Sequence, residues 1–303
     1  MTAFISFLMA ALRLSTPLSY AALGGYCSER SGTVNIALEG MMLMGAFTAA
    51  VAAHHTHSAA LGVLAGVGGG LTLAALHGLL CIQMRADQII SGMAVNFLAI
   101  GLPPVISKTL YDMSGGTPML LAHERVPTWF GISPLMAGAF VALALLITVH
   151  RRSRLGQYLR FAGEHPEALQ SQGVSVLRIR WTGVLLSGVL CGLAGAYLSI
   201  DHGGGFSRNM TAGRGYMALA ALIIGCWTPL GAMLAALTFG AIEASQILLQ
   251  GVTVAGGHTI PVQWIQVLPY IATLVILAGA SSGKLGLLIR ARPPKALGIP
   301  FAN

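Results

Sequence analysis

Long apolar stretches alternate with short polar ones along the whole chain. The apolar stretches are about 18 to 22 residues long, the length at which a helix crosses the hydrocarbon core of a bilayer. Spans are predicted over residues 4–26, 36–53, 59–83, 88–107, 131–150, 181–200, 214–228, 229–249 and 264–282. The pattern therefore predicts an all-α polytopic membrane protein with about eight to ten transmembrane helices.

Two of these stretches, 36–53 and 214–228, are short and follow Gly-rich polar segments. Such stretches are typical of broken or re-entrant helices, whose irregular ends are tolerated where they line a cavity. Residues 24–46 can be aligned with residues 204–226, and the two helices are expected to run in opposite directions, as in an inverted repeat. A chance match in a chain with 39 glycines explains the alignment equally well.

Proline residues predict two further interruptions. Pro103 and Pro104 should break the helix over 88–107, because proline lacks an amide donor and clashes with the preceding turn. Pro229 should separate the stretch over 214–228 from the one that follows it.

Composition excludes the soluble classes of protein. Hydrophobic residues make up 55% of the chain and charged residues only 9%, whereas a soluble domain carries about 25% charged residues. The longest polar segment, 151–180, is too short for a folded domain, so residues 1–303 are expected to form a single transmembrane domain. The sequence has no GxxxxGK[ST] phosphate loop, so a nucleotide would have to bind to another chain.

Charge predicts the orientation of the chain. Six arginines lie within 151–180, and more basic residues lie near the carboxyl end. Cytoplasmic loops collect Lys and Arg, so both segments are predicted to be cytoplasmic, and the net charge of +8 does not indicate a nucleic-acid partner. Nine spans then place the amino end outside. The first apolar stretch lacks a basic region and a cleavage site, so it is interpreted as a retained span.

The clearest polar interruption of the apolar pattern lies at 28–40, with the sequence SERSGTVNIALEG. Polar groups at membrane depth are costly unless they are paired, face a cavity or serve a function. Asn35 and Glu39 are four residues apart, so they are expected to share a helix face and to line a solute pathway. The alternative is that Glu29 and Arg30 lie at the interface and Glu39 makes a structural hydrogen bond.

Further polar residues lie within later spans. Asn96 interrupts the fourth span, and Glu243, Gln246 and Gln250 form a polar stripe on the span over 229–249. These side chains are candidates for lining the pathway of a polar solute. Hydrogen bonding between helices accounts for them as well.

Catalytic and metal sites have weaker support. His54, His55 and His57 lie close together at a predicted outer loop, but they have no carboxylate or cysteine companion nearby in the sequence, so no metal site is expected. Ser133 and Ser187 lack the context of a nucleophile, so no catalytic residue is expected and an intramembrane enzyme is a poor alternative.

The cytoplasmic loop 151–180 contains signals for a short helix. A glycine ends one element, proline suits the first turn of the next, carboxylates favour a helix start and a second glycine ends it. These positions are Gly163, Glu164, Pro166, Glu167 and Gly173. A short capped helix between two spans is suited to docking on a partner, although a solvated connector fits the pattern equally well.

Four segments of the chain, 16–47, 163–174, 213–241 and 260–279, resemble the permease subunits of bacterial ABC importers. The resemblance covers nearly the whole chain. It is closest to the nucleoside and simple-sugar branch of the ribose and branched-chain amino acid permease superfamily. His165 stands where this family usually has Asn.

The resemblance implies a permease of the bacterial inner membrane that moves nucleosides or simple sugars by alternating access and performs no covalent chemistry. It implies a cytoplasmic ATPase that binds ATP, a second permease subunit and a solute-binding protein. Residues 163–174 would be the coupling helix, and Asn35, Glu39 and Asn96 would line the pathway. An ion-coupled secondary transporter, with Glu39 or Glu243 as its coupling carboxylate, is the alternative.

Overall fold

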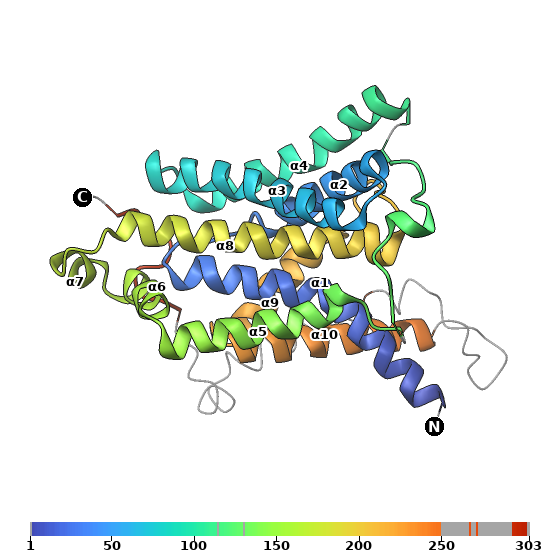
Figure 1. The fold of residues 1–303 in the computed structure, drawn as a ribbon. Coiled ribbons are helices and arrows are strands. Elements are labelled where there is room, and N and C mark those ends of the chain that lie inside the picture. The colour runs from blue at the N-terminus through green and yellow to red at the C-terminus, as the bar shows by residue number, and fades with distance from the viewer. Residues whose placement is uncertain are drawn as a thin grey trace.

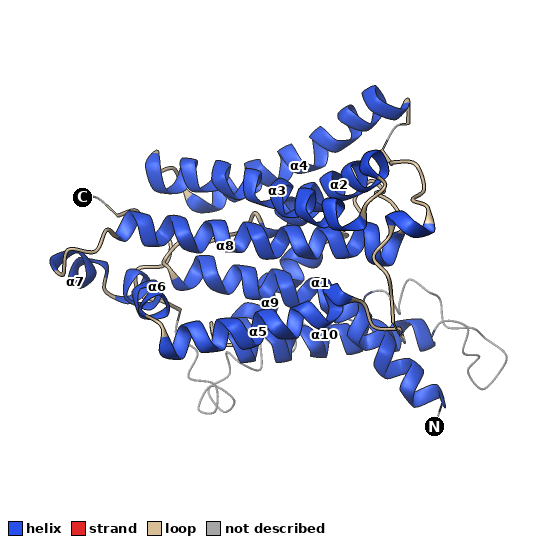
Figure 2. Cartoon of the chain, viewed as in Figure 1, coloured by secondary structure: helices blue, strands red, loops and turns tan. Residues whose placement is uncertain are grey.

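The described part of the chain is helical, with loops between the helices (Figure 2). A computed structural model describes residues 2–113, 115–129, 131–249, 267, 271 and 293–301. Its α-helices are α1 (Thr2–Arg30), α2 (Leu38–Thr56), α3 (Ala59–Gly78), α4 (Gln88–Tyr111), α5 (Pro134–Arg152), α6 (Arg154–Glu164), α7 (Pro166–Ser171), α8 (Val176–Ala196), α9 (Arg214–Ile224) and α10 (Pro229–Leu249). Three short segments complete them: the π-helical η1 (Leu79–Gln83) and η3 (Tyr197–Gly203) extend α3 and α8, and the 3₁₀ turn η2 (Ala122–Glu124) lies between α4 and α5.

Six described segments are long and apolar enough to cross a membrane. They are Phe4–Arg30, Ala59–Gln83, Gln88–Tyr111, Pro134–Arg152, Val176–Gly203 and Pro229–Ile247. Together with the two shorter helices α2 and α9, they match eight of the nine predicted spans. The ninth prediction, 264–282, lies outside the described residues apart from 267 and 271, as does Gln250.

The helices α1 and α8 form the middle of the bundle. Figure 1 shows α2, α3 and α4 on one side of this pair and α5, α9 and α10 on the other. Contacts agree with this view, because α8 packs against α1, α2 and α3, and α1 packs against α9 and α10. Glycines allow the closest approaches: a Cβ atom on Gly45 of α2 would lie 2.8 Å from the Cα of Gly192 on α8. Small residues at such crossings let backbones pack closely in membranes.

The proline predictions have different outcomes. Pro229 begins α10, as expected, after a turn at Gly225–Thr228. The break expected at Pro103 and Pro104 is wrong, because α4 continues through both residues to Tyr111. Each proline removes one backbone N–H donor. The loss of this hydrogen bond bends a helix but does not end it when the hydrogen bonds of the neighbouring turns are kept. The last turns of α4 diverge from the bundle (Figure 1).

The 151–180 segment and the amino end lie at different ends of the bundle. Helix α6, which carries Arg154 and Arg160, lies at one end together with α7 and residues 293–301, and the amino end of α1 lies at the opposite end (Figure 1). This arrangement agrees with an amino end on the opposite side of the membrane from the 151–180 segment. The turn between α2 and α3 and the connection from α4 to α5 lie at the same end as the amino terminus (Figure 1).

Candidate functional site

The two short helices α2 and α9 meet at their amino ends inside the bundle. Glu39, in the first turn of α2, accepts hydrogen bonds from the backbone N–H groups of Gly213 (2.8 Å) and Gly215 (2.6 Å). The first N–H groups of a helix have no partner within it and carry the positive end of its dipole, so a carboxylate satisfies them well. Glu39 is buried, with 4% of its surface exposed. It therefore fixes the start of α9 against the start of α2.

Asn96 of α4 connects the same two helix starts. Its Oδ1 accepts a hydrogen bond from the N–H of Gly40 (2.8 Å). Its Nδ2 donates to the carbonyl of Ile36 and to the hydroxyl of Tyr216, both at 3.0 Å. A Cβ atom on Gly40 would lie 2.8 Å from Oδ1 of Asn96, so this close approach requires glycine. The amide thus links α4, α2 and α9.

Asn35 has a different environment from the one predicted. It lies in the loop before α2, so Asn35 and Glu39 do not share a helix face, and that prediction is wrong. The Oδ1 of Asn35 accepts from the N–H of Ala37 (3.1 Å), and its Nδ2 donates to Oγ of Ser187 on α8 (2.8 Å). The short loop turns the side chain toward α8, whereas Glu39 points to α9.

An ion pair joins α9 to α10. The Nη2 of Arg214 lies 2.6 Å from Oε1 of Glu243, and their side chains are 19% and 20% exposed. In the described part of the chain, Oε2 of Glu243 and Nε of Arg214 are buried and have no hydrogen-bond partner. Gln246, one turn further along α10, is 9% exposed. This pair keeps a free acceptor and a free donor beside the first turn of α9.

The structure therefore gathers three of the predicted pathway residues, Glu39, Asn96 and Glu243, around the first turn of α9. Their role in transport stays a prediction. Sequence reasoning missed Arg214 and Tyr216, which complete the network. Their signal is the polar GRGY string at the start of an apolar helix, because residues of the first turn lie nearest to any partner of the helix start.

The first helix ends in two charged contacts, one buried and one partly buried. Glu29 is 3% exposed and accepts a hydrogen bond from Nε1 of Trp227 (2.6 Å). The Glu29 side chain therefore faces the protein interior and not solvent, and its depth in the membrane stays a prediction. Arg30 pairs with Glu164 at the end of α6, with 3.3 Å between Nη1 and Oε1. Both contacts join the end of α1 to elements far away in the sequence.

The predicted coupling segment divides into a buried half and an exposed half. Gly163 and Glu164 end α6 and pack against α1; a Cβ atom on Gly163 would clash with the carbonyl oxygen of Arg30. The prediction that Glu164 lies at the start of the next helix is therefore wrong, because Glu164 is the last residue of α6. That helix, α7, starts at Pro166, is six residues long and is shorter than the two turns expected. Glu167 on α7 is exposed, and Gly173 follows the helix with a positive φ of 78°.

Residues near the carboxyl end bind this coupling segment to the α1–α2 loop. The N–H of Ala296 donates to the carbonyl of Gly163 (2.8 Å), and the N–H of Gly298 donates to the carbonyl of Gly32 (3.2 Å). Arg180 at the start of α8 donates from Nη1 to the carbonyl of Ile299 (2.8 Å). One short peptide thus touches α6, α8 and the loop that leads to Asn35.

The described helices, six of them long and apolar enough to cross a membrane, form a bundle of the kind found in polytopic membrane proteins. A solved structure described as an inward-facing ABC transporter of the metal-chelate type has the same fold, with a TM-score of 0.51 and 16% identity, over 90% of this chain and 85% of that chain. The chain belongs to the family described as the permease component of branched-chain amino acid transport systems, whose model matches residues 7–277.

Two relatives match the chain over nearly its full length. The nucleoside ABC transporter permease NupC of Lactococcus lactis subsp. cremoris is 34% identical, over 95% of this chain and 93% of its own length. The guanosine ABC transporter permease NupQ of Bacillus subtilis is 34% identical, over 96% of this chain and 95% of its own length.

Proposed function

We propose that the chain is the permease subunit of an ATP-driven importer of nucleosides in the bacterial inner membrane. The observation that carries the proposal is the 34% identity to two nucleoside permeases over almost the entire chain. A nucleoside offers ribose hydroxyls and the polar edge of its base, which carboxylates, amides and guanidinium groups bind by hydrogen bonds. The network around the first turn of α9 contains each of these three kinds of group.

In this proposal the α9 network forms part of the solute pathway. The helix starts of α2 and α9 supply fixed dipoles, as the half-helices of transporters do near their substrates. Free Oε2 of Glu243 accepts a hydroxyl or base N–H of the passing solute, and free Nε of Arg214 donates to it. Each of these contacts would bind the solute only weakly, because a solute that is bound tightly would not leave the pathway.

Coupling would run from α7 to the α1–α2 loop. We infer that a cytoplasmic ATPase docks on the exposed side of α7, where Glu167 lies. A displacement of α7 moves α6, which the Arg30–Glu164 pair and the carboxyl-terminal peptide tie to α1 and Gly32. The same loop leads into Asn35 and the start of α2. ATP hydrolysis belongs to the ATPase, and a second permease subunit and a solute-binding protein complete the importer.

Uptake of labelled nucleosides by intact cells tests this function. We expect deletion of the gene to abolish the high-affinity uptake of guanosine or uridine, and the wild-type gene to restore it. Excess unlabelled nucleoside should compete, and excess ribose or galactose should not. Normal nucleoside uptake in the deletion strain, with lost uptake of a sugar, would reassign the substrate class.

The site is tested in the same assay with two neighbouring substitutions on α4. Asn96→Leu removes the amide that joins α2 to α9, and we expect uptake to fall by tenfold or more. Phe97→Leu is the matched control, because Phe97 is 68% exposed on the same helix. Both variants must reach the membrane in equal amounts. Equal uptake by the two variants would remove Asn96 from the pathway.

A further inference from the structure

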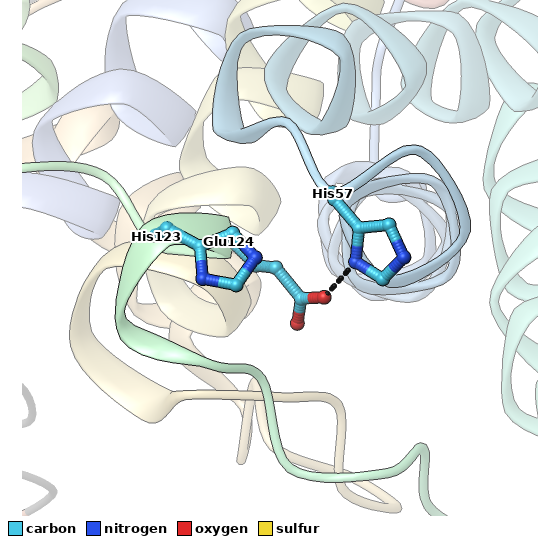
Figure 3. Close-up of side chains that lie close together, drawn as sticks. All are labelled: His57, His123 and Glu124. Atoms are coloured by element: carbon cyan, nitrogen blue, oxygen red, sulfur yellow. Dashed lines mark hydrogen bonds and ion pairs between the residues drawn. The ribbon is translucent and has the colours of Figure 1, made fainter.

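Three polar side chains from distant parts of the sequence converge at the end of the bundle opposite α7. His57 follows the last turn of α2, with a positive φ of 52°, and His123 and Glu124 belong to the turn η2 between α4 and α5. Figure 3 shows the Glu124 carboxylate between the two imidazole rings. The network around α9 does not use these residues.

Their donor atoms lie close enough to share one ion. One ligand atom of each of the three residues lies within 4.8 Å of the other two. The Nδ1 of His57 is 2.5 Å from Oε1 of Glu124, and the rings of His57 and His123 are 5.9 Å apart at their centroids. Ligand atoms around a tetrahedral zinc ion lie about 3.3 Å apart, because each bond is about 2.0 to 2.1 Å long. Rotation of the exposed His57 and His123 rings would bring the ligand atoms from within 4.8 Å of one another to this tetrahedral spacing.

Glu124 is an unusual residue for an external loop. Its carboxylate is fully buried although the histidines beside it are exposed. Its Oε2 accepts a hydrogen bond from the N–H of Leu121 (2.9 Å). This bond and the bond to His57 give each carboxylate oxygen a partner. A buried anion beside accessible imidazoles provides both charge and access for a cation.

A fourth group stands next to the cluster. The Nδ1 of His54 lies 3.9 Å from Oε2 of Glu124. In the described structure this buried nitrogen has no hydrogen-bond partner. Three imidazoles and one carboxylate match the ligand preferences of zinc, and the affinity order of divalent metals favours Zn²⁺, Ni²⁺ and Cu²⁺ over Ca²⁺ or Mg²⁺ at nitrogen ligands.

We propose that His57, His123 and Glu124 bind a zinc ion at this end of the permease, with the fourth position open to water or His54. The sequence alone argued against this site, because the histidines near residue 54 have no carboxylate close to them in the chain. The fold brings Glu124 to within hydrogen-bond distance of His57 across 67 positions.

A bound ion ties the end of α2 to the α4–α5 connection. That connection is already attached to the end of α8, because Val126 N–H donates to the carbonyl of Ile200 (3.1 Å) and Leu120 N–H donates to that of Gly204 (2.9 Å). Zinc would therefore hold α2, whose other end carries Glu39, against α8 at the side where solute enters. A ligand that binds only the folded state stabilises it, so zinc should raise the unfolding temperature.

Binding is measured on the full-length protein, purified in detergent without a polyhistidine tag. Competition with a chromophoric chelator gives the zinc affinity, and Co²⁺ gives the absorption spectrum of a tetrahedral site. We expect one Zn²⁺ per chain in the wild type. His123→Ala should weaken binding at least tenfold and leave the His57–Glu124 hydrogen bond in place. His55→Ala is the matched control, because His55 stacks on Tyr111 outside the cluster, and it should stay within twofold of wild type.

Zinc should also raise the unfolding temperature of the wild type and of His55→Ala, and leave that of His123→Ala unchanged. The proposal fails if His123→Ala binds zinc as tightly as the wild type. It fails equally if His55→Ala loses as much affinity as His123→Ala, since the binding would then belong to scattered surface imidazoles.

Discussion

At the scale of single residues, Glu39 is the side chain on which the candidate site depends most. It is buried at the first turn of α2 and accepts two N–H groups from the first turn of α9. An anion at a helix start interacts with both the unpaired donors and the dipole, so the charge matters as well as the shape. The sequence argument left a pathway role and a structural role open, and the geometry gives Glu39 at least the structural one.

Glu39→Gln should destabilise the protein without changing its size. One oxygen becomes an NH₂ group that faces a backbone donor, so one charge-assisted bond is lost, which costs about 1.5 to 3 kcal/mol. Thermal unfolding in detergent measures the effect. Glu167→Gln is the control, because it makes the same change from carboxylate to carboxamide at an exposed residue of α7. It should unfold at the same temperature as the wild type. Equal unfolding temperatures for the two variants would contradict a capping role for Glu39.

At the scale of elements, α6 is the connection between the exposed α7 and the bundle. Its last residues contact the end of α1 through the Arg30–Glu164 pair and the close approach of Gly163 to a carbonyl. A partly buried pair of this kind fixes relative position more than it adds stability. In the proposed mechanism we expect this contact to transmit a displacement of α7 to α1, which a solvated connector would not do.

A charge exchange tests this contact. Glu164→Arg places two arginines together, and we expect nucleoside uptake to fall at least fivefold. Adding Arg30→Glu to the same chain restores an ion pair with the two charges exchanged, and this double variant should recover part of the uptake. Glu167→Arg on the exposed side of α7 should also lower uptake, but Arg30→Glu should not rescue it. Failure of rescue for Glu164→Arg would show that the pair is incidental.

The elements were predictable to different degrees. Runs of about 20 apolar residues identify spans because the bilayer sets their length, and eight of the nine predicted spans have a helix at the expected place. The course of α4 beyond Pro103 was not predictable, because neighbouring helices decide whether a proline bends or ends a helix. The partners of Glu39 and Glu124 were not predictable either, since contacts across 174 and 67 positions depend on how the helices pack.

At the scale of the whole molecule, the carboxyl-terminal peptide closes the structure at the α7 end. It bonds Gly163, Gly32 and Arg180, which belong to three separate parts of the chain. A small core beneath it, formed by Leu159, Ala162, Leu169, Val176 and Ile179, holds α6, α7 and α8 together. We therefore expect this end to move as one unit when α7 is displaced.

Removal of residues 294–303 should lower uptake severalfold while the protein remains in the membrane, because Gly163 and Gly32 lose their common partner. Arg180→Gln should give a similar loss, since Arg180 donates to the carbonyl of Ile299. The two changes act on one contact, so the combined variant should be no worse than either alone. Additive losses in uptake would mean that Arg180 acts elsewhere.

The central claim is that this permease moves nucleosides with energy from ATP. The most direct measurement is the initial rate of labelled guanosine uptake in cells whose proton gradient is collapsed by an ionophore while their ATP level is maintained. We expect uptake to persist under these conditions and to stop when ATP is depleted with the gradient intact. Uptake that follows the gradient and ignores ATP would contradict the account and identify an ion-coupled transporter instead.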